Sequence, residues 1–144
     1  MEKINTQVLL DYCLEKRKSL TPTRALVIFT LAKYNKPKSA YDLREEINKK
    51  KYTNINISTI YRVLDFWIKM GLIHKIATLN KYLLCQKPKE KHIHLLNFCT
   101  KCENVVESCS QKMGLNFKKS TSELDLLLIK EHSIEVPVLC PRCS

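Results

Sequence analysis

Six of the seven cysteines lie at or after Cys85, and four of them form two closely spaced pairs. These pairs are Cys99 with Cys102 and Cys140 with Cys143, each with two residues between the cysteines. That gap allows both sulfur atoms of a pair to face one metal ion, and four thiolates are the donor set of a structural zinc site. The sequence therefore predicts a zinc ion that holds together the two ends of a small domain. A redox-active pair, or unrelated buried cysteines, are the alternatives.

A second group combines two imidazoles, a thiolate and a carboxylate: His74, Cys85, His92 and Glu107. These donors make a plausible four-coordinate zinc shell, and the soft thiolate disfavours manganese and magnesium. Each residue also has an ordinary explanation as a strand, core, linker or surface residue. His94 is an alternative to His92, and Cys109 is a less favoured ligand. A metal held by this group would fix the relative angle of two domains.

The apolar spacing in the first half predicts four helices followed by a hairpin. The expected helices cover about 5–18, 22–34, 40–48 and 58–68, with a capping box at Ser39 and Ser58 as a candidate N-cap. The strands are expected at 73–77 and 82–85. Helices followed by a hairpin are typical of a winged helix-turn-helix domain, in which the fourth helix here would read DNA.

The second half has a strand-rich pattern. Strands are expected at 94–98, 105–107 and 134–139, with a helix at 110–119 that Gly114 weakens. The predicted fold class is α+β, with a winged-helix domain at 1–85, a linker at 86–91 and a small metal-binding α+β domain at 92–144. The apolar stretches are too short to span a membrane, and the N-terminus lacks a signal-peptide pattern. A cytoplasmic protein with reduced thiols is expected.

Positive charge is concentrated in the first half. The chain has a formal charge of +11, and residues 1–85 hold 16 basic and 7 acidic residues. A basic domain with a recognition helix favours a nucleic-acid partner. Arg62 is suited to a bidentate contact with guanine. Tyr61 is either a DNA contact or a half-buried core residue, and the candidates for phosphate contacts include Lys18, Arg24 and Lys75.

Several motifs together resemble the ferric uptake regulator family, most closely its zinc-sensing branch. The resemblance covers nearly the whole chain. It is carried by Leu20–Arg24, Ser39–Leu43, Ser58–Phe66, Gly71–Lys75, Tyr82–Cys85 and the two cysteine pairs.

The resemblance implies a homodimeric, zinc-activated repressor that binds pseudo-palindromic operators of zinc-uptake genes. It implies that Tyr61 and Arg62 contact DNA. It also implies that the four paired cysteines hold structural zinc and that the mixed group holds regulatory zinc. Two Zn²⁺ ions per chain are expected from this ligand count.

Other functions are less favoured by the sequence. No histidine precedes His74, so a sensing site with a histidine from the first 73 residues cannot form, and zinc is favoured over iron or peroxide sensing. A thiol oxidoreductase would need a βαβ context, and a zinc hydrolase would need an open metal position and a general base. We therefore expect no enzymatic activity. A constitutive DNA-binding module with purely structural zinc remains the other alternative.

Overall fold

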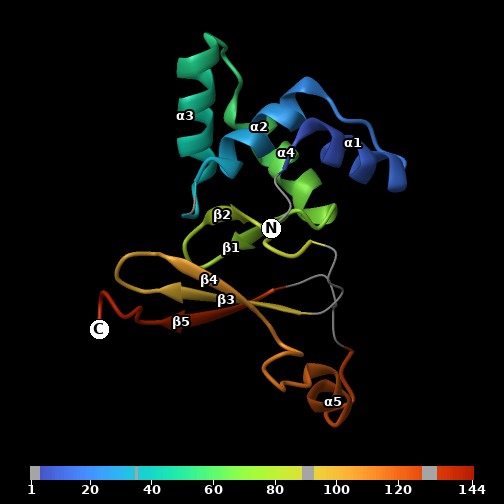
Figure 1. The fold of residues 1–144 in the computed structure, drawn as a ribbon, viewed down its shortest axis with the longest axis vertical. Helices are drawn as coiled ribbons and strands as arrows, with labels where there is room; N and C mark the ends of the chain where they lie inside the picture. Colours follow the sequence, from blue (N-terminus) through green and yellow to red (C-terminus); the bar gives the residue numbers. More distant parts are fainter. Residues whose placement is uncertain (1–3, 35, 89–92, 128–132) are drawn as a thin grey trace. The chain divides into compact units, whose positions relative to one another are not determined.

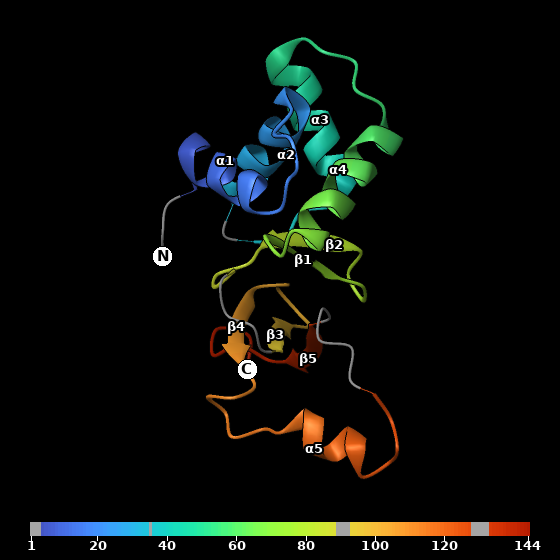
Figure 2. The ribbon, with the colours of Figure 1, turned by 90° about the vertical axis from the view of Figure 1, so that its right-hand side faces the viewer.

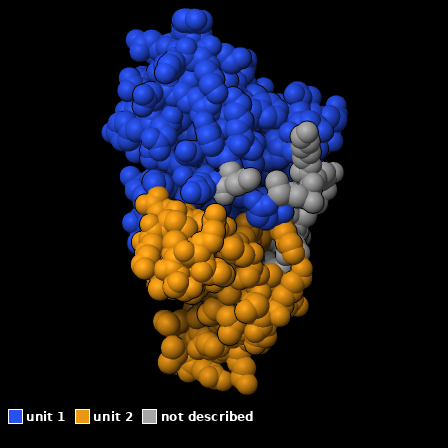
Figure 3. All heavy atoms as spheres, turned by 60° about the vertical axis from the view of Figure 1, so that its left-hand side comes forward, with its two compact units in different colours: residues 1–86 blue, residues 87–144 orange. Residues whose placement is uncertain are grey.

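The chain divides into two compact units. The computed structural model describes residues 4–34, 36–88, 93–127 and 133–144. Unit 1 is Met1–Gln86 and unit 2 is Lys87–Ser144, coloured separately in Figure 3. Residues 89–91 of the predicted linker 86–91, and His92, lie outside the described residues.

Unit 1 consists of helices and one hairpin, as the apolar spacing predicts (Figure 1). The helices are α1 (Thr6–Glu15), α2 (Pro22–Ala32), α3 (Ala40–Lys51) and α4 (Ile57–Lys69). The hairpin pairs β1 (Ile73–Ile76) antiparallel with β2 (Lys81–Leu84). Lys38 adds a single antiparallel bridge to Tyr82, which ties the segment before α3 to the hairpin.

Several predicted helix boundaries were wrong. Helix α1 ends at Glu15 instead of about Lys18, because the chain leaves the helix at Arg17, whose φ is 52°. Helix α2 ends at Ala32 instead of about Tyr34. Helix α3 does not stop at Asn48 but continues to Lys51, where three successive lysines lie in the last turn and favour the negative end of the helix. Helix α4 is capped by Asn56 instead of Ser58. Asn56 has an extended backbone, and its side chain accepts a 2.9 Å hydrogen bond from the Thr59 N–H. Ser58 lies inside the first turn and donates its hydroxyl to Asn56.

The core of unit 1 lies between the helices and the hairpin. Helix α4 buries one face, and its Trp67 is fully buried. The indole N–H of Trp67 donates a 2.9 Å hydrogen bond to the Arg24 carbonyl of α2, so its polar atom is satisfied inside the core. These contacts fix α4 against α2.

Unit 2 is built on a three-stranded sheet with the order β4-β3-β5. The strands are β3 (His94–Cys99), β4 (Val105–Cys109) and β5 (Ile134–Val138). Strand β3 pairs antiparallel with β4 and parallel with β5. The parallel pair places the C-terminal ends of β3 and β5 at one edge of the sheet.

The short helix α5 (Phe117–Ser122) lies between β4 and β5 in the sequence and apart from the sheet in Figure 2. The predicted helix at 110–119 was therefore wrong in its bounds. Gly114 has a positive φ of 73°, which interrupts the segment with turns, and the helix begins only after Asn116. Across the described part of the chain, no helix combines the length and apolar character needed to cross a membrane.

Candidate metal centres and DNA-binding surface

The four paired cysteines meet at the edge of the sheet where β3 and β5 end. Cys99 is the last residue of β3 and is the register partner of Val138 in β5. Because the two strands are parallel, the turn after β3 carries Cys102 toward the segment that carries Cys140 and Cys143. The sulfur atoms of the four cysteines all lie within 4.8 Å of one another. The sheet topology therefore brings together two pairs that are 41 positions apart in the sequence.

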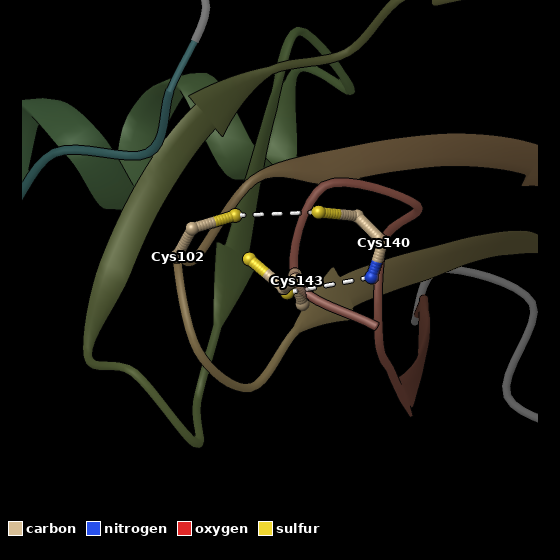
Figure 4. Close-up of side chains that lie close together, drawn as sticks. Cys102, Cys140 and Cys143 are labelled. Carbon is tan, nitrogen blue, oxygen red and sulfur yellow. Dashed lines mark hydrogen bonds between the residues drawn. The ribbon is translucent and has the colours of Figure 1, made fainter.

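The sulfur atoms of this cluster face one another without forming disulfides. Figure 4 shows Cys102, Cys140 and Cys143, and the Cys102 and Cys140 Sγ atoms are 3.7 Å apart. A disulfide needs about 2.05 Å between its sulfur atoms. All seven cysteines are free thiols. The separation suits sulfur atoms that share one tetrahedral metal ion.

Backbone N–H groups favour the thiolate form of Cys99. The Cys140 N–H donates to the Cys99 sulfur over 3.5 Å. The N–H groups of Cys102 and Cys140 lower the pKa of Cys99 to about 6. A thiolate is the form that binds a metal. Four cysteine sulfurs in this arrangement fit a closed structural zinc site, in which the protein supplies all four ligands.

The second predicted metal-binding group combines histidine, cysteine and glutamate, and each unit contributes one pair of these residues. In unit 2, the Nδ1 atom of His94 contacts the Glu107 carboxylate. His94 pairs with Cys109 and Leu96 pairs with Glu107, so the imidazole and carboxylate lie on one face of the β3–β4 ladder. The sequence prediction named His92, which lies outside the described residues.

In unit 1, a ring nitrogen of His74 and the Cys85 sulfur lie within 4.8 Å of each other. His74 is opposite Leu83 in the hairpin, and Cys85 directly follows the end of β2, two residues after Leu83. The Cys85 N–H donates a 2.9 Å bond to the Leu72 carbonyl, which fixes the cysteine beside the strand. Each unit therefore presents one histidine and one anionic ligand.

The residues predicted to contact DNA have different surroundings. Arg62 is exposed on α4, whereas Tyr61 is half-buried and meets Tyr41 edge-on at a ring separation of 6.4 Å. Lys18 is exposed after α1, and Lys75 is exposed on β1. Among these residues, Arg62, Lys18 and Lys75 present exposed cationic side chains that can bind phosphates or base edges.

Arg24 has contacts inside unit 1 that the sequence did not reveal. Its guanidinium lies 3.7 Å from the centre of the Phe66 ring and donates a hydrogen bond to the Ser19 carbonyl over 2.6 Å. These contacts link the start of α2 to α4. A DNA contact by Arg24 stays a prediction, and it would have to share the guanidinium with this packing role.

One further residue had only a secondary place in the sequence prediction, and another was missed. His94 was only an alternative ligand, because the β3–β4 register that sets it beside Glu107 cannot be deduced from spacing alone. Asn48 received no role, although its side chain bonds to the backbone before α4. An Asn near the C-terminal end of a helix was the only available signal.

Together, the four helices with their hairpin and the four-cysteine cluster define a winged-helix protein with a second, metal-binding unit. The sequence model described as "Ferric uptake regulator family" matches residues 15–136. The chain belongs to the ferric uptake regulator family.

The chain is similar to known proteins along most of its own length and of theirs. The chain is 29% identical to the zinc uptake regulation protein of Escherichia coli K12, over 99% of this chain and 85% of the relative. A solved structure of a zinc uptake regulator complexed with zinc and DNA is similar with a TM-score of 0.83 and 28% identity, covering 98% of this chain and 96% of that one. The structure of holo XcZur gives a TM-score of 0.81 with 27% identity, covering 95% and 94%.

Proposed function

We propose that this protein is a zinc-responsive transcriptional repressor, in which zinc acts as the corepressor on operators of zinc-uptake genes. The observation that carries the proposal is that a winged-helix unit and its neighbour each present a histidine and an anionic ligand, in a chain that also has a closed four-cysteine cluster. The similar structure solved with zinc and DNA supports the choice of metal and partner.

Zinc would occupy two sites in each chain. Cys99, Cys102, Cys140 and Cys143 would hold the structural ion. His74, Cys85 and Glu107 would hold the regulatory ion with a histidine from unit 2, either the predicted His92 or His94. The imidazole, thiolate and carboxylate donors suit zinc better than manganese or magnesium. Another divalent metal, such as iron, is the second candidate for the regulatory position.

The switch would act through the mutual orientation of the two units. Zinc that takes ligands from both units favours the orientations in which the ligands converge. If those orientations also match the spacing of the major grooves, DNA affinity rises with zinc occupancy. By linkage, DNA must then raise zinc affinity by the same factor. A fully protein-ligated ion suits this role better than hydrolysis, which needs an open position, so we propose no catalytic activity.

DNA reading would centre on α4. Its exposed Arg62 can form two hydrogen bonds with a guanine in the major groove, while Lys18 and Lys75 contact phosphates. Tyr61 would contact DNA only with the edge that is not packed against Tyr41. The net charge of +11 favours association with a polyanion.

A homodimer would present two copies of α4 to a pseudo-palindromic operator. Unit 2 offers an apolar surface for such an assembly. Several large apolar side chains around α5 are exposed: Met113, Leu115, Leu124, Leu126 and Leu127. Burial of these side chains against a second copy of the chain would favour association. Free cysteines as zinc ligands also require a reducing compartment, which supports the cytoplasm as the location.

The proposal is tested with the purified full chain and a duplex that it selects from a random-sequence pool. We expect two zinc ions per chain and a rise in affinity for the selected duplex as the second zinc binds. Titrations with iron and manganese in parallel should give a smaller rise. Equal affinity with one and two bound zinc ions would contradict the proposal and favour a constitutive DNA-binding module.

Arg62→Ala is expected to reduce sequence reading more than general DNA binding. Loss of a bidentate base contact costs about 1–3 kcal/mol of discrimination, or about 5-fold to 150-fold in affinity. Affinity for a mixed-sequence duplex should change much less, as fluorescence anisotropy can measure. Lys69→Ala, which removes a positive charge from the same helix, is the matched control. It should lower the affinity for both duplexes to a similar extent. Equal losses for Arg62→Ala on both duplexes would make Arg62 a phosphate contact.

A further inference from the structure

We propose that Asn48 is a positioning residue for DNA reading, because it fixes the loop from which α4 begins. The inference rests on the proposed function, since it concerns how α4 is presented to DNA. The loop between α3 and α4 comprises residues 52–56. It starts at Tyr52, whose positive φ of 50° ends α3 in the left-handed conformation.

The Asn48 side chain pairs with both backbone polar groups of Ile55. Its Oδ1 accepts a 2.9 Å hydrogen bond from the Ile55 N–H. Its Nδ2 donates a 3.0 Å bond to the Ile55 carbonyl. The carboxamide therefore binds this loop residue as a neighbouring strand would. Two bonds to one residue fix both the distance and the rotation of that peptide segment.

Two neighbouring side chains add hydrogen bonds to the Asn48–Ile55 pair. Arg44, one turn earlier on α3, donates its Nε–H to the same Ile55 carbonyl over 3.1 Å. The Thr53 hydroxyl donates to the Asn48 Oδ1 over 3.1 Å. The Ile55 side chain packs against the core of unit 1. The last turns of α3 thus hold the loop by its backbone while the core holds it by its apolar side chain.

The residue that these bonds hold, Ile55, is next to the N-cap of α4. Asn56 follows Ile55 directly and caps α4 by accepting hydrogen bonds from the N–H and the hydroxyl of Thr59. A shift of Ile55 would therefore move the cap and the first turn, one turn before Arg62. Because base contacts depend on sub-ångström placement, this shift should reduce specific binding more than phosphate attraction.

Asn48 is not part of the apolar core. It is half-buried, and the buried cluster that includes Leu43, Ile47 and Trp67 is formed by other side chains. Removal of the carboxamide leaves that cluster intact but deprives the partly buried Ile55 N–H of its partner. We therefore expect unit 1 to stay folded, while the first turn of α4 is no longer held in one position.

The test compares Asn48→Ala with wild type on the selected duplex and on a mixed-sequence duplex, both at saturating zinc. We expect affinity for the selected duplex to fall about tenfold or more, while mixed-sequence affinity stays within about twofold. Asn54→Ala is the matched control, because it removes an exposed carboxamide from the same loop and leaves both bonds between Asn48 and Ile55 in place. It should keep the wild-type ratio of the two affinities.

The outcomes separate the inference from the proposed function. If wild type selects no sequence, the proposed function fails, whatever Asn48 does. If Asn48→Ala keeps the wild-type ratio and loses only thermal stability, Asn48 is structural and the inference is overturned. If Asn48→Ala does not fold, Asn48→Asp decides, because it retains the acceptor but not the donor. A lower affinity ratio in folded Asn48→Asp supports the inference, and an unchanged ratio overturns it.

Discussion

Loss of metal from the four-cysteine cluster is expected to unfold the sheet of unit 2 and leave unit 1 folded. The cluster joins the ends of β3 and β5, so without the ion the parallel pair loses the link that closes it. Structural zinc contributes about 10–16 kcal/mol of apparent binding free energy in small zinc domains. This exceeds the free energy of unfolding expected for a unit of this size. Unit 2 should therefore not fold in the metal-free protein.

The single tryptophan makes the two units separately observable. Trp67 is fully buried in unit 1, and unit 2 has none. After treatment with a strong chelator, hydrogen exchange should show loss of protection in β3 and β5, while Trp67 emission stays that of a buried indole. Cys102→Ser should reproduce this and lower the zinc content by one ion per chain. Cys109→Ala, a buried cysteine outside the cluster, is the control. Continued protection of β3 and β5 in metal-free protein would contradict the expectation.

Substitution of His74 or Cys85 is expected to abolish the zinc response while leaving the four-cysteine ion in place. Coupling between two sites is typically worth about 1–3 kcal/mol, so zinc should raise operator affinity about 5-fold to 150-fold in the wild type. In His74→Ala or Cys85→Ala, this factor should fall to about one, because each substitution removes one of the two regulatory ligands that unit 1 would supply. Anisotropy titrations with and without zinc measure it directly.

The controls for this prediction also identify the fourth ligand. Cys13→Ala removes a buried cysteine of unit 1 far along the chain from the ligands and should keep the full zinc response. His92→Ala and His94→Ala tested side by side show which histidine completes the site, since only the ligand should matter strongly. A normal zinc response in both His74→Ala and Cys85→Ala would exclude the proposed regulatory site.

The sequence was most informative where one local pattern determines the structure. The capping box at Ser39 and the apolar face of α4 follow from short-range spacing, and both are confirmed. The two cysteine pairs were equally recognisable, because a two-residue gap is itself the geometry of a metal knuckle. That the pairs converge could be expected from the chemistry of zinc. Their meeting place at the edge of a parallel strand pair could not.

Features that depend on register or on tertiary contacts escaped prediction. The position of His94 beside Glu107 depends on how β3 slides against β4, and a shift of one residue would have turned the imidazole to the other face. The packing of Arg24 on Phe66 depends on the angle between α2 and α4. Neither has a short-range signature. The N-cap of α4 is a different case, because Asn56 and Ser58 are both preferred N-cap residues and only the structure shows that Asn56 accepts the Thr59 N–H.

The parallel pairing of β3 with β5 sets an order of events during synthesis. Cys99 and Cys140 are 41 positions apart, and all of unit 1 leaves the ribosome before either cysteine pair. Folding of nascent domains proceeds from the N-terminal side. The DNA-reading half can thus mature while the ribosome is still translating, whereas zinc loading of the four-cysteine cluster must wait for Cys143. A product truncated before Cys140 would lack half of the four-cysteine cluster that we expect to hold the sheet of unit 2, and with the sheet the pairing that sets His94 beside Glu107. It would be a basic, DNA-attracted fragment whose zinc response we expect to be lost.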